Sequence, residues 1–274
     1  MRSSGTAPTI LIVKGLLICL TLALLGLGSS QGKRLPLSGK TFEVGGHTAF
    51  LIMPGKPPPA GELRPWVWYA PTLPGLPGKE EKWMLTRFIE NGVAIAGIDV
   101  GESYGSPEGR RLYTALYRTL TKDHGLSSRA CLLGRSRGGL MLYNWAAENP
   151  AKLACIAGIY PVCNLASWPG LAKCSKAYGL SPQGLAESLK DHNPIDRLAP
   201  LAKAQVPIFH IHGDKDRVVP LQANSGLVSQ RYAKLGGSMT LKIMKNQGHN
   251  MWPGWFQDGD LVAFILQHAT RLKE

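Results

Sequence analysis

Several patterns that would point to a repeat protein, a multidomain chain or a nucleic-acid-binding protein are absent from this sequence. Its 274 residues contain no internal repeat, no low-complexity linker, no run of lysine and arginine, and no row of aromatic residues set between basic ones. A nucleic-acid partner is therefore not expected. The composition, with 44% hydrophobic and 18% charged residues, excludes disorder, collagen and coiled coil and is typical of one globular α/β domain.

Acidic residues are scarce. The chain has 18 Asp and Glu against 31 Lys and Arg, which gives a formal net charge of +13. The basic residues are scattered, so a generally basic proteome accounts for the excess of positive charge without any partner. Attraction to an anionic surface, such as acidic polysaccharide or a cell envelope, is the alternative that this charge leaves open.

Cysteine is also sparse, with five in the whole chain. A domain of this length buries enough surface to fold without disulfides or metals. Cys131 and Cys155 lie in apolar runs, which is typical of inert buried thiols. Cys163 and Cys174 lie in a loop-like stretch, where their spacing leaves a disulfide open without requiring one.

No apolar run is long enough to predict a spanning helix outright. The longest, residues 15–28 (GLLICLTLALLGLG), follows Lys14 and gives way to the polar Ser29, Ser30 and Gln31. A basic start and a short apolar centre predict a signal peptide over residues 1–30, and hence a secreted or periplasmic protein. An uncleaved membrane anchor and an overextended gene start are the alternatives.

Residues 31–274 alternate β-rich runs with amphipathic stretches, which predicts a single α/β domain. The middle strands are apolar throughout, as in a mostly parallel eight-stranded sheet with helices on both faces, and the first two are close enough for an antiparallel hairpin. The predicted strands are Thr41–Val44, Thr48–Met53, Trp66–Tyr69, Val93–Asp99, Ala130–Leu133, Ala154–Tyr160, Ile208–His212 and Thr240–Met244. The predicted helices are Glu80–Asn91, Arg110–His124, Gly138–Asn149, Leu221–Leu235 and Leu261–Arg271. Residues 161–206 are too many for an ordinary connection and predict an insertion over the sheet, of a kind that often shapes an active site.

The pattern Gly-x-Ser-x-Gly, which marks a sharp turn between a strand and a helix, occurs three times. Ser30 has neither a strand before it nor a helix after it. Ser103 follows a strand, but Pro107 and Gly109 delay the next helix, so we expect a loop beside the site. Ser136 comes directly after the apolar run ACLLG and directly before a helical stretch, so it is the candidate nucleophile.

A serine hydroxyl needs a base, and the base needs a carboxylate to orient it. Asp214 and Asp216 follow the strand PIFHIH, and His249 follows the last strand in NQGHN. The order serine, acid, histidine is the one expected for an α/β-hydrolase fold. The residues alone leave both aspartates open as the acid.

The segments GRSRGG, HGDKDRVVP and NQGH together resemble the α/β-hydrolase superfamily, nearest the prolyl-oligopeptidase-like and dienelactone-hydrolase-like branches, over residues 40–274. The resemblance implies the α/β-hydrolase fold and assigns the acid to Asp216, with Asp214 as the alternative. It also gives His212 an ordinary place at a strand end. His210 and His212 share one face of a strand but have no third ligand near them in the sequence, so no metal and no cofactor are expected.

Acyl transfer also needs donors for the developing oxyanion. The backbone N–H of Arg137 is expected to be one, because it follows the nucleophile. Relatives commonly carry His-Gly in the loop that supplies the second oxyanion donor, whereas this loop reads Ala-Pro-Thr-Leu-Pro-Gly from position 70. Thr72 and Leu73 are therefore candidates for the second donor by position alone. The aromatic residues expected on the same rim, as a substrate-binding surface or as ordinary packing, are Tyr104, Trp168, Trp252 and Trp255.

These residues predict a serine hydrolase that forms an acyl-enzyme on Ser136 and cleaves carboxylic esters of small molecules or of polysaccharides. A serine peptidase of prolyl-oligopeptidase type is the first alternative, although no propeller domain and no evident acidic pair for a peptide amino terminus are present. A catalytically inactive, hydrolase-like binding protein is the second.

Overall fold

The computed structural model of this chain describes residues 33–270, together with Met1 and Gly5. The chain divides into two units, residues 1–32 and 33–274, and all described helices and strands belong to the second. The predicted signal peptide, with its apolar run, lies outside the described residues. Within the part of the chain that is described, no helix combines the length and the hydrophobicity needed to cross a membrane.

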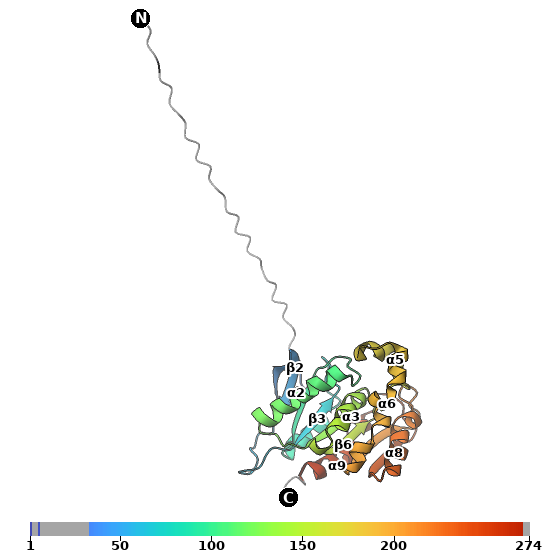
Figure 1. Cartoon of the computed structure of the whole chain (residues 1–274). Coiled ribbons are helices and arrows are strands. Elements are labelled where there is room, and N and C mark those ends of the chain that lie inside the picture. The colour runs from blue at the N-terminus through green and yellow to red at the C-terminus, as the bar shows by residue number, and fades with distance from the viewer. Residues whose placement is uncertain (2–4, 6–32, 271–274) are drawn as a thin grey trace. The chain divides into compact units, whose positions relative to one another are not determined.

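Eight strands form one sheet in the order β1-β2-β4-β3-β5-β6-β7-β8. Figure 1 labels β2, β3 and β6 of this sheet. β1 and β2 form an antiparallel hairpin, β2 is antiparallel to β4, and the other neighbouring pairs are parallel. The strands are Lys40–Val44 (β1), His47–Ile52 (β2), Trp66–Ala70 (β3), Ala94–Ile98 (β4), Ala130–Arg135 (β5), Leu153–Ile159 (β6), Ile208–Gly213 (β7) and Met239–Met244 (β8). These bounds confirm the predicted strands, the leading hairpin and the mostly parallel sheet.

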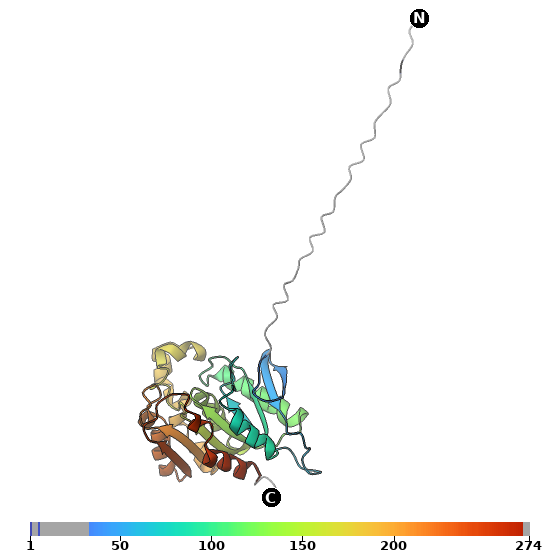
Figure 2. The same cartoon turned by 180° about the vertical axis from the view of Figure 1, so that it is seen from behind.

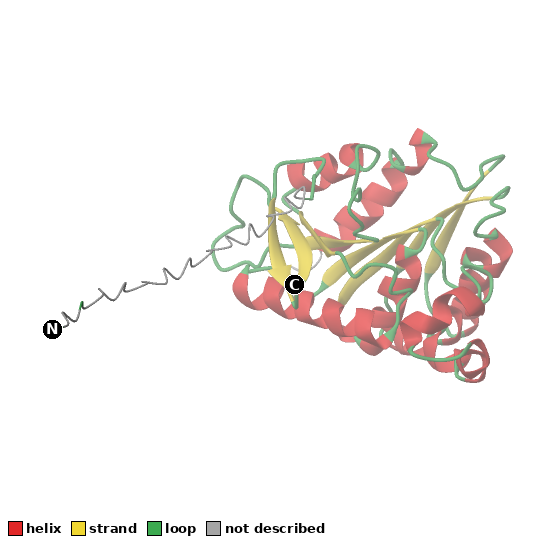
Figure 3. Ribbon diagram, turned by 90° about the horizontal axis from the view of Figure 1, so that it is seen from above, coloured by secondary structure: helices red, strands yellow, loops and turns green. Residues whose placement is uncertain are grey.

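Helices cover both faces of the sheet, so the domain has three layers (Figure 3; Figure 2 shows the domain from behind). On one face lie α2 (Pro107–Asp123), α3 (Gly138–Glu148) and α8 (Ser225–Lys234). On the other face lie α1 (Lys82–Glu90) and α9 (Gly259–Thr270). The arrangement confirms the predicted α/β-hydrolase fold.

Strand β3 shows how the sequence specifies these layers. All five of its residues are buried, and side chains along a strand point alternately to opposite faces. Trp66 and Trp68 therefore pack under α2 and α3, where the Trp68 ring centroid lies 4.7 Å from that of Trp145. Val67 and Tyr69 belong to the core under α1 and α9. A strand covered on both faces has to be apolar throughout.

Residues 161–206, which the sequence predicts to be an insertion, hold four short helices: α4 (Leu171–Cys174), α5 (Pro182–Glu187), α6 (Leu189–His192) and α7 (Ala199–Lys203). The sequence does not predict these helices. Each is at most six residues long, which is too short to show a helical period. Leu165, Tyr178 and Leu185 of the insertion form a small apolar cluster with Tyr104, Leu140 and Val219 of the domain.

Cys163 and Cys174, whose spacing left a disulfide open, are both free thiols in the structure. The two side chains belong to different apolar clusters: Cys163 packs in the main core and Cys174 in the cluster of the insertion. Burial raises the pKa of both thiols. They serve as packing groups.

The helix predicted at Leu221–Leu235 is interrupted. A 3-10 turn at Leu221–Ala223 precedes α8, and Asn224 separates the two. The Asn224 Oδ1 atom accepts the backbone N–H groups of Cys163 and Asn164, at 2.9 and 3.1 Å. The break in the helix therefore anchors the start of the insertion to the domain.

Candidate active site

The turn between β5 and α3 holds Ser136 in a left-handed backbone conformation, with φ of 49°. Such a conformation is costly for a residue with a side chain and is typical of a serine displayed on a sharp strand-to-helix turn. Two hydrogen bonds fix the turn, from Ser136 N to Ile159 O at 3.0 Å and from Val162 N to Ser136 O at 2.8 Å. Gly138 allows the turn to pack against β3, since a Cβ there would lie 2.1 Å from the carbonyl oxygen of Ala70.

The serine, histidine and aspartate predicted from the sequence lie in one hydrogen-bonded row. Ser136 Oγ is 2.9 Å from His249 Nε2, and His249 Nδ1 is 2.8 Å from Asp216 Oδ2. An ionised carboxylate only accepts, so Nδ1–H donates to Asp216 and Nε2 is free to accept the serine proton. This is the geometry of a nucleophile, a base and an orienting acid.

The carboxyl group of Asp216 is fixed and ionised. Its Oδ1 accepts the backbone N–H groups of Val218 and Val219, at 3.0 and 2.8 Å. Burial by itself would raise the pKa of Asp216, but hydrogen bonds from His212, His249 and Val219 outweigh it and hold this pKa well below its usual value. Asp214, the alternative acid, accepts the backbone N–H of Asn246 at 2.7 Å and ties down the turn.

The loop that carries His249 is held against the turn that carries Asp216. The backbone N–H of Lys215 donates to Gln247 O at 2.9 Å. A Cβ at Gly213 would lie 2.1 Å from the same carbonyl oxygen, so only glycine permits this approach. These contacts therefore hold the two loops, which are far apart in the sequence, against each other.

A buried row of polar side chains runs from the core to Asp216. Tyr143 OH lies 2.8 Å from His210 Nε2, and Ser225 Oγ lies 2.9 Å from His210 Nδ1 and 2.7 Å from His212 Nδ1. His212 Nε2 donates to Val219 O at 2.8 Å. If Tyr143 and Ser225 donate their hydroxyl protons along this row, the hydroxyl protons and both imidazole N–H groups find acceptors.

The same contacts leave the two histidines with no free ring nitrogen. Burial, and then the neighbouring His212, lowers the pKa of His210 to about 3, so its imidazole is neutral. Among the described residues, no group of three or more His, Cys, Asp or Glu side chains is arranged to hold a metal ion.

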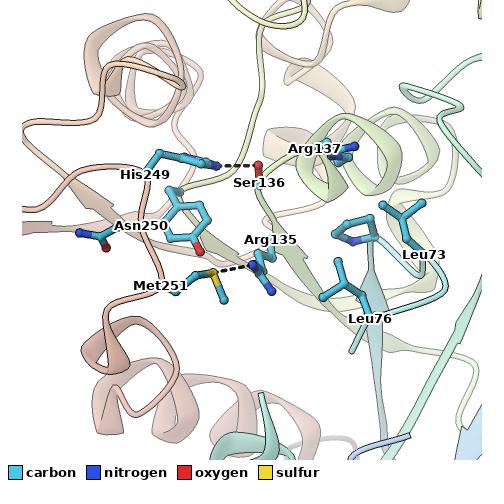
Figure 4. A pocket seen from close by; sticks show the side chains of 10 residues that line it. Leu73, Leu76, Arg135, Ser136, Arg137, His249, Asn250 and Met251 are labelled. Carbon is cyan, nitrogen blue, oxygen red and sulfur yellow. Dashed lines mark hydrogen bonds between the residues drawn. The ribbon is translucent and has the colours of Figure 1, made fainter. Parts of the chain in front are cut away.

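Ser136 and His249 open into a pocket of about 230 Å³. In Figure 4, His249 and Met251 stand on one side of it, Leu73 and Leu76 on the other, and Arg135 between them. The lining residues are Pro71, Leu73, Leu76, Arg135, Ser136, Arg137, Tyr160, His249, Asn250 and Met251. The pocket is small and partly apolar, and two arginines, Arg135 and Arg137, are among its lining residues.

The sequence profile of the prolyl oligopeptidase family matches residues 113–271, which contain the whole Ser136–His249–Asp216 row. The chain belongs to the prolyl oligopeptidase family. It is 26% identical over 145 residues to the acylamino-acid-releasing enzyme of Arabidopsis thaliana, which is 47% of this chain and 19% of that enzyme.

Members of the family with solved structures share the fold at low sequence identity. A puromycin-hydrolyzing peptidase of Mycobacterium tuberculosis superimposes with a TM-score of 0.67 at 16% identity, over 86% of this chain and 41% of the peptidase. Dipeptidyl peptidase 4 of Porphyromonas gingivalis does so with a TM-score of 0.66 at 14% identity, over 84% and 35%. The chain therefore spans less than half the length of these family members.

Thr72 and Leu73, the two candidates for the second oxyanion donor, lie in different surroundings. Leu73 borders the pocket together with Arg137, so it is the better placed of the two residues to supply the second donor. Thr72 is buried and does not border it, and its hydroxyl donates to Tyr69 O at 3.1 Å. Within the described residues, the backbone N–H groups of Arg137 and Leu73 have no protein acceptor.

The aromatic residues expected on the rim do not line this pocket. The Tyr104 and Trp168 rings pack on each other with centroids 6.0 Å apart, and the Arg137 guanidinium lies over Trp168. The Trp252 ring packs edge-on against the buried Trp255. Ordinary packing therefore describes the contacts of these aromatic residues better than a substrate-binding surface does.

The aromatic residue that does line the pocket, Tyr160, was missed by the sequence analysis. Its ring centroid lies 4.4 Å from that of His249 and 5.2 Å from that of Trp255. Tyr160 directly follows β6 with a φ of 37°. Its place at the end of a central parallel strand is the signal that could have identified it, because ligands bind at that edge of an α/β sheet.

Proposed function

We propose that this protein is a serine hydrolase of peptidase type, which cleaves amide bonds in small N-acylated substrates through an acyl-enzyme on Ser136. The observation that carries the proposal is the hydrogen-bonded row of Ser136, His249 and Asp216 at the mouth of a pocket. A binding protein would not require an ionised carboxylate, a correctly oriented imidazole and a strained serine in this order.

The geometry supports the following chemistry. Ser136 Oγ attacks the substrate carbonyl carbon while its proton passes to His249 Nε2, and Asp216 stabilises the imidazolium that forms. The oxyanion accepts the backbone N–H of Arg137 and that of Leu73. His249 then returns the proton to the leaving amine as the C–N bond breaks. Water repeats the sequence on the acyl-enzyme and releases the carboxylic acid and free Ser136.

Two observations favour amides of N-acylated substrates over the carboxylic esters predicted first. The family and its named relatives are peptidases, and the Arabidopsis relative is named for the release of acylamino acids. No Asp or Glu is among the residues that line the pocket, so it offers a free peptide amino terminus no counter-ion. Export through residues 1–30 and an anionic surface partner remain predictions.

Fluorophosphonate labelling tests the nucleophile, because the reagent reacts only with an activated serine. We expect labelling of the folded wild type and none of Ser136→Ala, with Ser103→Ala labelled like the wild type. N-acetyl-aminoacyl, free aminoacyl and p-nitrophenyl ester substrates, compared by kcat/KM, test the bond and the amino terminus. Faster cleavage of free aminoacyl than of N-acetylated nitroanilides would contradict the acyl preference. Ester turnover with no amide turnover would restore the esterase interpretation.

A further inference from the structure

We propose that Arg135 selects the substrate by binding a carboxylate that lies a few bonds from the scissile carbonyl. The proposal rests on the proposed function in that Ser136 supplies the reaction. The substrate class that it names is an acyl component with an acidic side chain, such as an N-acylated glutamyl or aspartyl residue.

Arg135 occupies the position directly before the nucleophile and borders the same pocket. Its side chain is only 13% exposed, and its guanidinium lies over the ring of Phe256, 5.0 Å from the centroid. Figure 4 shows it between the two loops that bound the pocket. A group bound there would be within a few bonds of the carbonyl that Ser136 attacks.

A buried carboxylate holds the guanidinium in place. Arg135 Nη1 donates to Glu81 Oε1 at 2.6 Å, and Glu81 is completely buried. Glu81 also accepts Tyr69 OH at 2.7 Å and the backbone N–H of Gly78 at 2.8 Å. Its two oxygens thus serve three donors, so Arg135 is fixed from behind with little freedom to turn.

The other amino group of the guanidinium lies beside a weak acceptor. Arg135 Nη2 lies 2.9 Å from the thioether sulfur of Met251, and a thioether is a poor acceptor for a charged donor. Met251 is 46% exposed, so it can swing aside at small cost. A carboxylate that replaced it would form a charge-assisted hydrogen bond to a donor that is already oriented.

An anion bound in the pocket would meet basic residues and no acidic residue in the lining. Its lining residues include Arg135 and Arg137 and no acidic residue. The partners of these arginines, Glu81 and Glu102, lie outside the lining, and Glu81 is saturated by donors of its own. The pocket volume of about 230 Å³ is small and suits a short acidic side chain better than an extended peptide.

The test compares N-acetyl-Glu-p-nitroanilide with N-acetyl-Gln-p-nitroanilide, which have almost the same shape and differ in charge. We expect the wild type to prefer the glutamyl substrate in kcat/KM by roughly 10- to 100-fold, as for one charge-assisted hydrogen bond. This ratio is measured on the wild type and depends on no variant. Equal kcat/KM for the two substrates would overturn the proposal.

A matched pair of double variants assigns the preference to Arg135. Arg135→Gln with Glu81→Gln removes both charges without leaving one buried and unpaired, and we expect it to cleave the two substrates equally. Arg87→Gln with Glu90→Gln removes an exposed pair on α1 and should keep the wild-type ratio. The double variant Arg137→Gln with Glu102→Gln keeps the backbone N–H of residue 137. It should also keep most of the preference for the glutamyl substrate. Loss of the preference in this last variant alone would move the site to Arg137.

Binding to Ser136→Ala separates this proposal from the proposed function. We expect calorimetry to show tighter binding of the uncleaved glutamyl substrate than of the glutaminyl one. That result without fluorophosphonate labelling of the wild type would keep the anion site and remove the hydrolase. Labelling and turnover with no difference between the two substrates would keep the hydrolase and remove the anion site.

Discussion

His212 lies directly beneath Asp216, with its Nε2 atom 3.5 Å from Asp216 Oδ2 and 2.8 Å from the carbonyl oxygen of Val219. The backbone N–H of Val219 in turn donates to Asp216 Oδ1. One residue of the turn therefore accepts from the histidine and donates to the carboxylate. The orientation of Asp216 depends on a side chain that never meets the substrate.

Replacing His212 by Ala is expected to lower kcat roughly 10-fold with little change in KM, because the carboxylate loses its alignment while the pocket is intact. It should also lower the free energy of unfolding by about 1–3 kcal/mol, since Val219 O and Ser225 lose a buried partner. Steady-state kinetics and urea denaturation measure the two effects. A large rise in KM at unchanged kcat would mean that His212 shapes the pocket instead.

The two aspartates of the HGDKDRVVP segment should differ sharply. Asp216→Asn removes the acceptor that sets the tautomer of His249, and we expect kcat to fall by roughly four orders of magnitude with the fold retained. Asp214→Asn changes the same charge two residues away, in contact only with a loop amide, and should stay within a few-fold of wild type. Assays of both variants on one N-acetyl-aminoacyl-p-nitroanilide decide between them. Comparable losses in the two would contradict the assignment.

The stability of the fold should depend on pH through His210. Its folded pKa of about 3 lies below the unfolded value near 6.5, so in this window the unfolded chain binds more protons. His210 contributes fully above pH 6.5, and the contribution falls by up to about 1.4 kcal/mol per pH unit as the pH drops toward 3. Denaturation of wild type and His210→Gln at several pH values measures this slope. Parallel slopes for the two proteins would show that another group titrates.

The strands and the catalytic row were predictable because their signals are local. An apolar run such as that of β3 is typical of a buried strand. The Ser136 turn and the Asp216 segment each carry their pattern within a few residues. The base that pairs with Ser136 could be predicted from the order of the strands along the chain in a parallel sheet.

The pocket walls were not predictable, because they depend on which way loop side chains face after packing. Trp252 has the size of a substrate-binding residue but packs on Trp255, whereas Tyr160, which has a left-handed backbone angle, lines the pocket. Arg135 looks like an ordinary solvated charge in the sequence. Its role follows from Glu81, which lies 54 residues earlier and is buried beneath it.

The approach of the β3 loop to the Ser136 turn provides the last prediction. A Cβ at Gly138 would lie 2.1 Å from Ala70 O and 2.6 Å from Pro71 N, so Gly138→Ala must push the loop that carries Leu73 away from Arg137. We expect a loss of about 1–3 kcal/mol in the free energy of unfolding from overpacking. We also expect a fall in kcat of roughly 100-fold or more, as for loss of one oxyanion donor.

Gly75→Ala is the matched control for this prediction. It lies in the same loop, and a methyl group added there would have nothing within 4 Å, so it should leave both kcat and stability close to wild type. Wild-type turnover by a folded Gly138→Ala protein would show that the β3 loop does not supply the second donor.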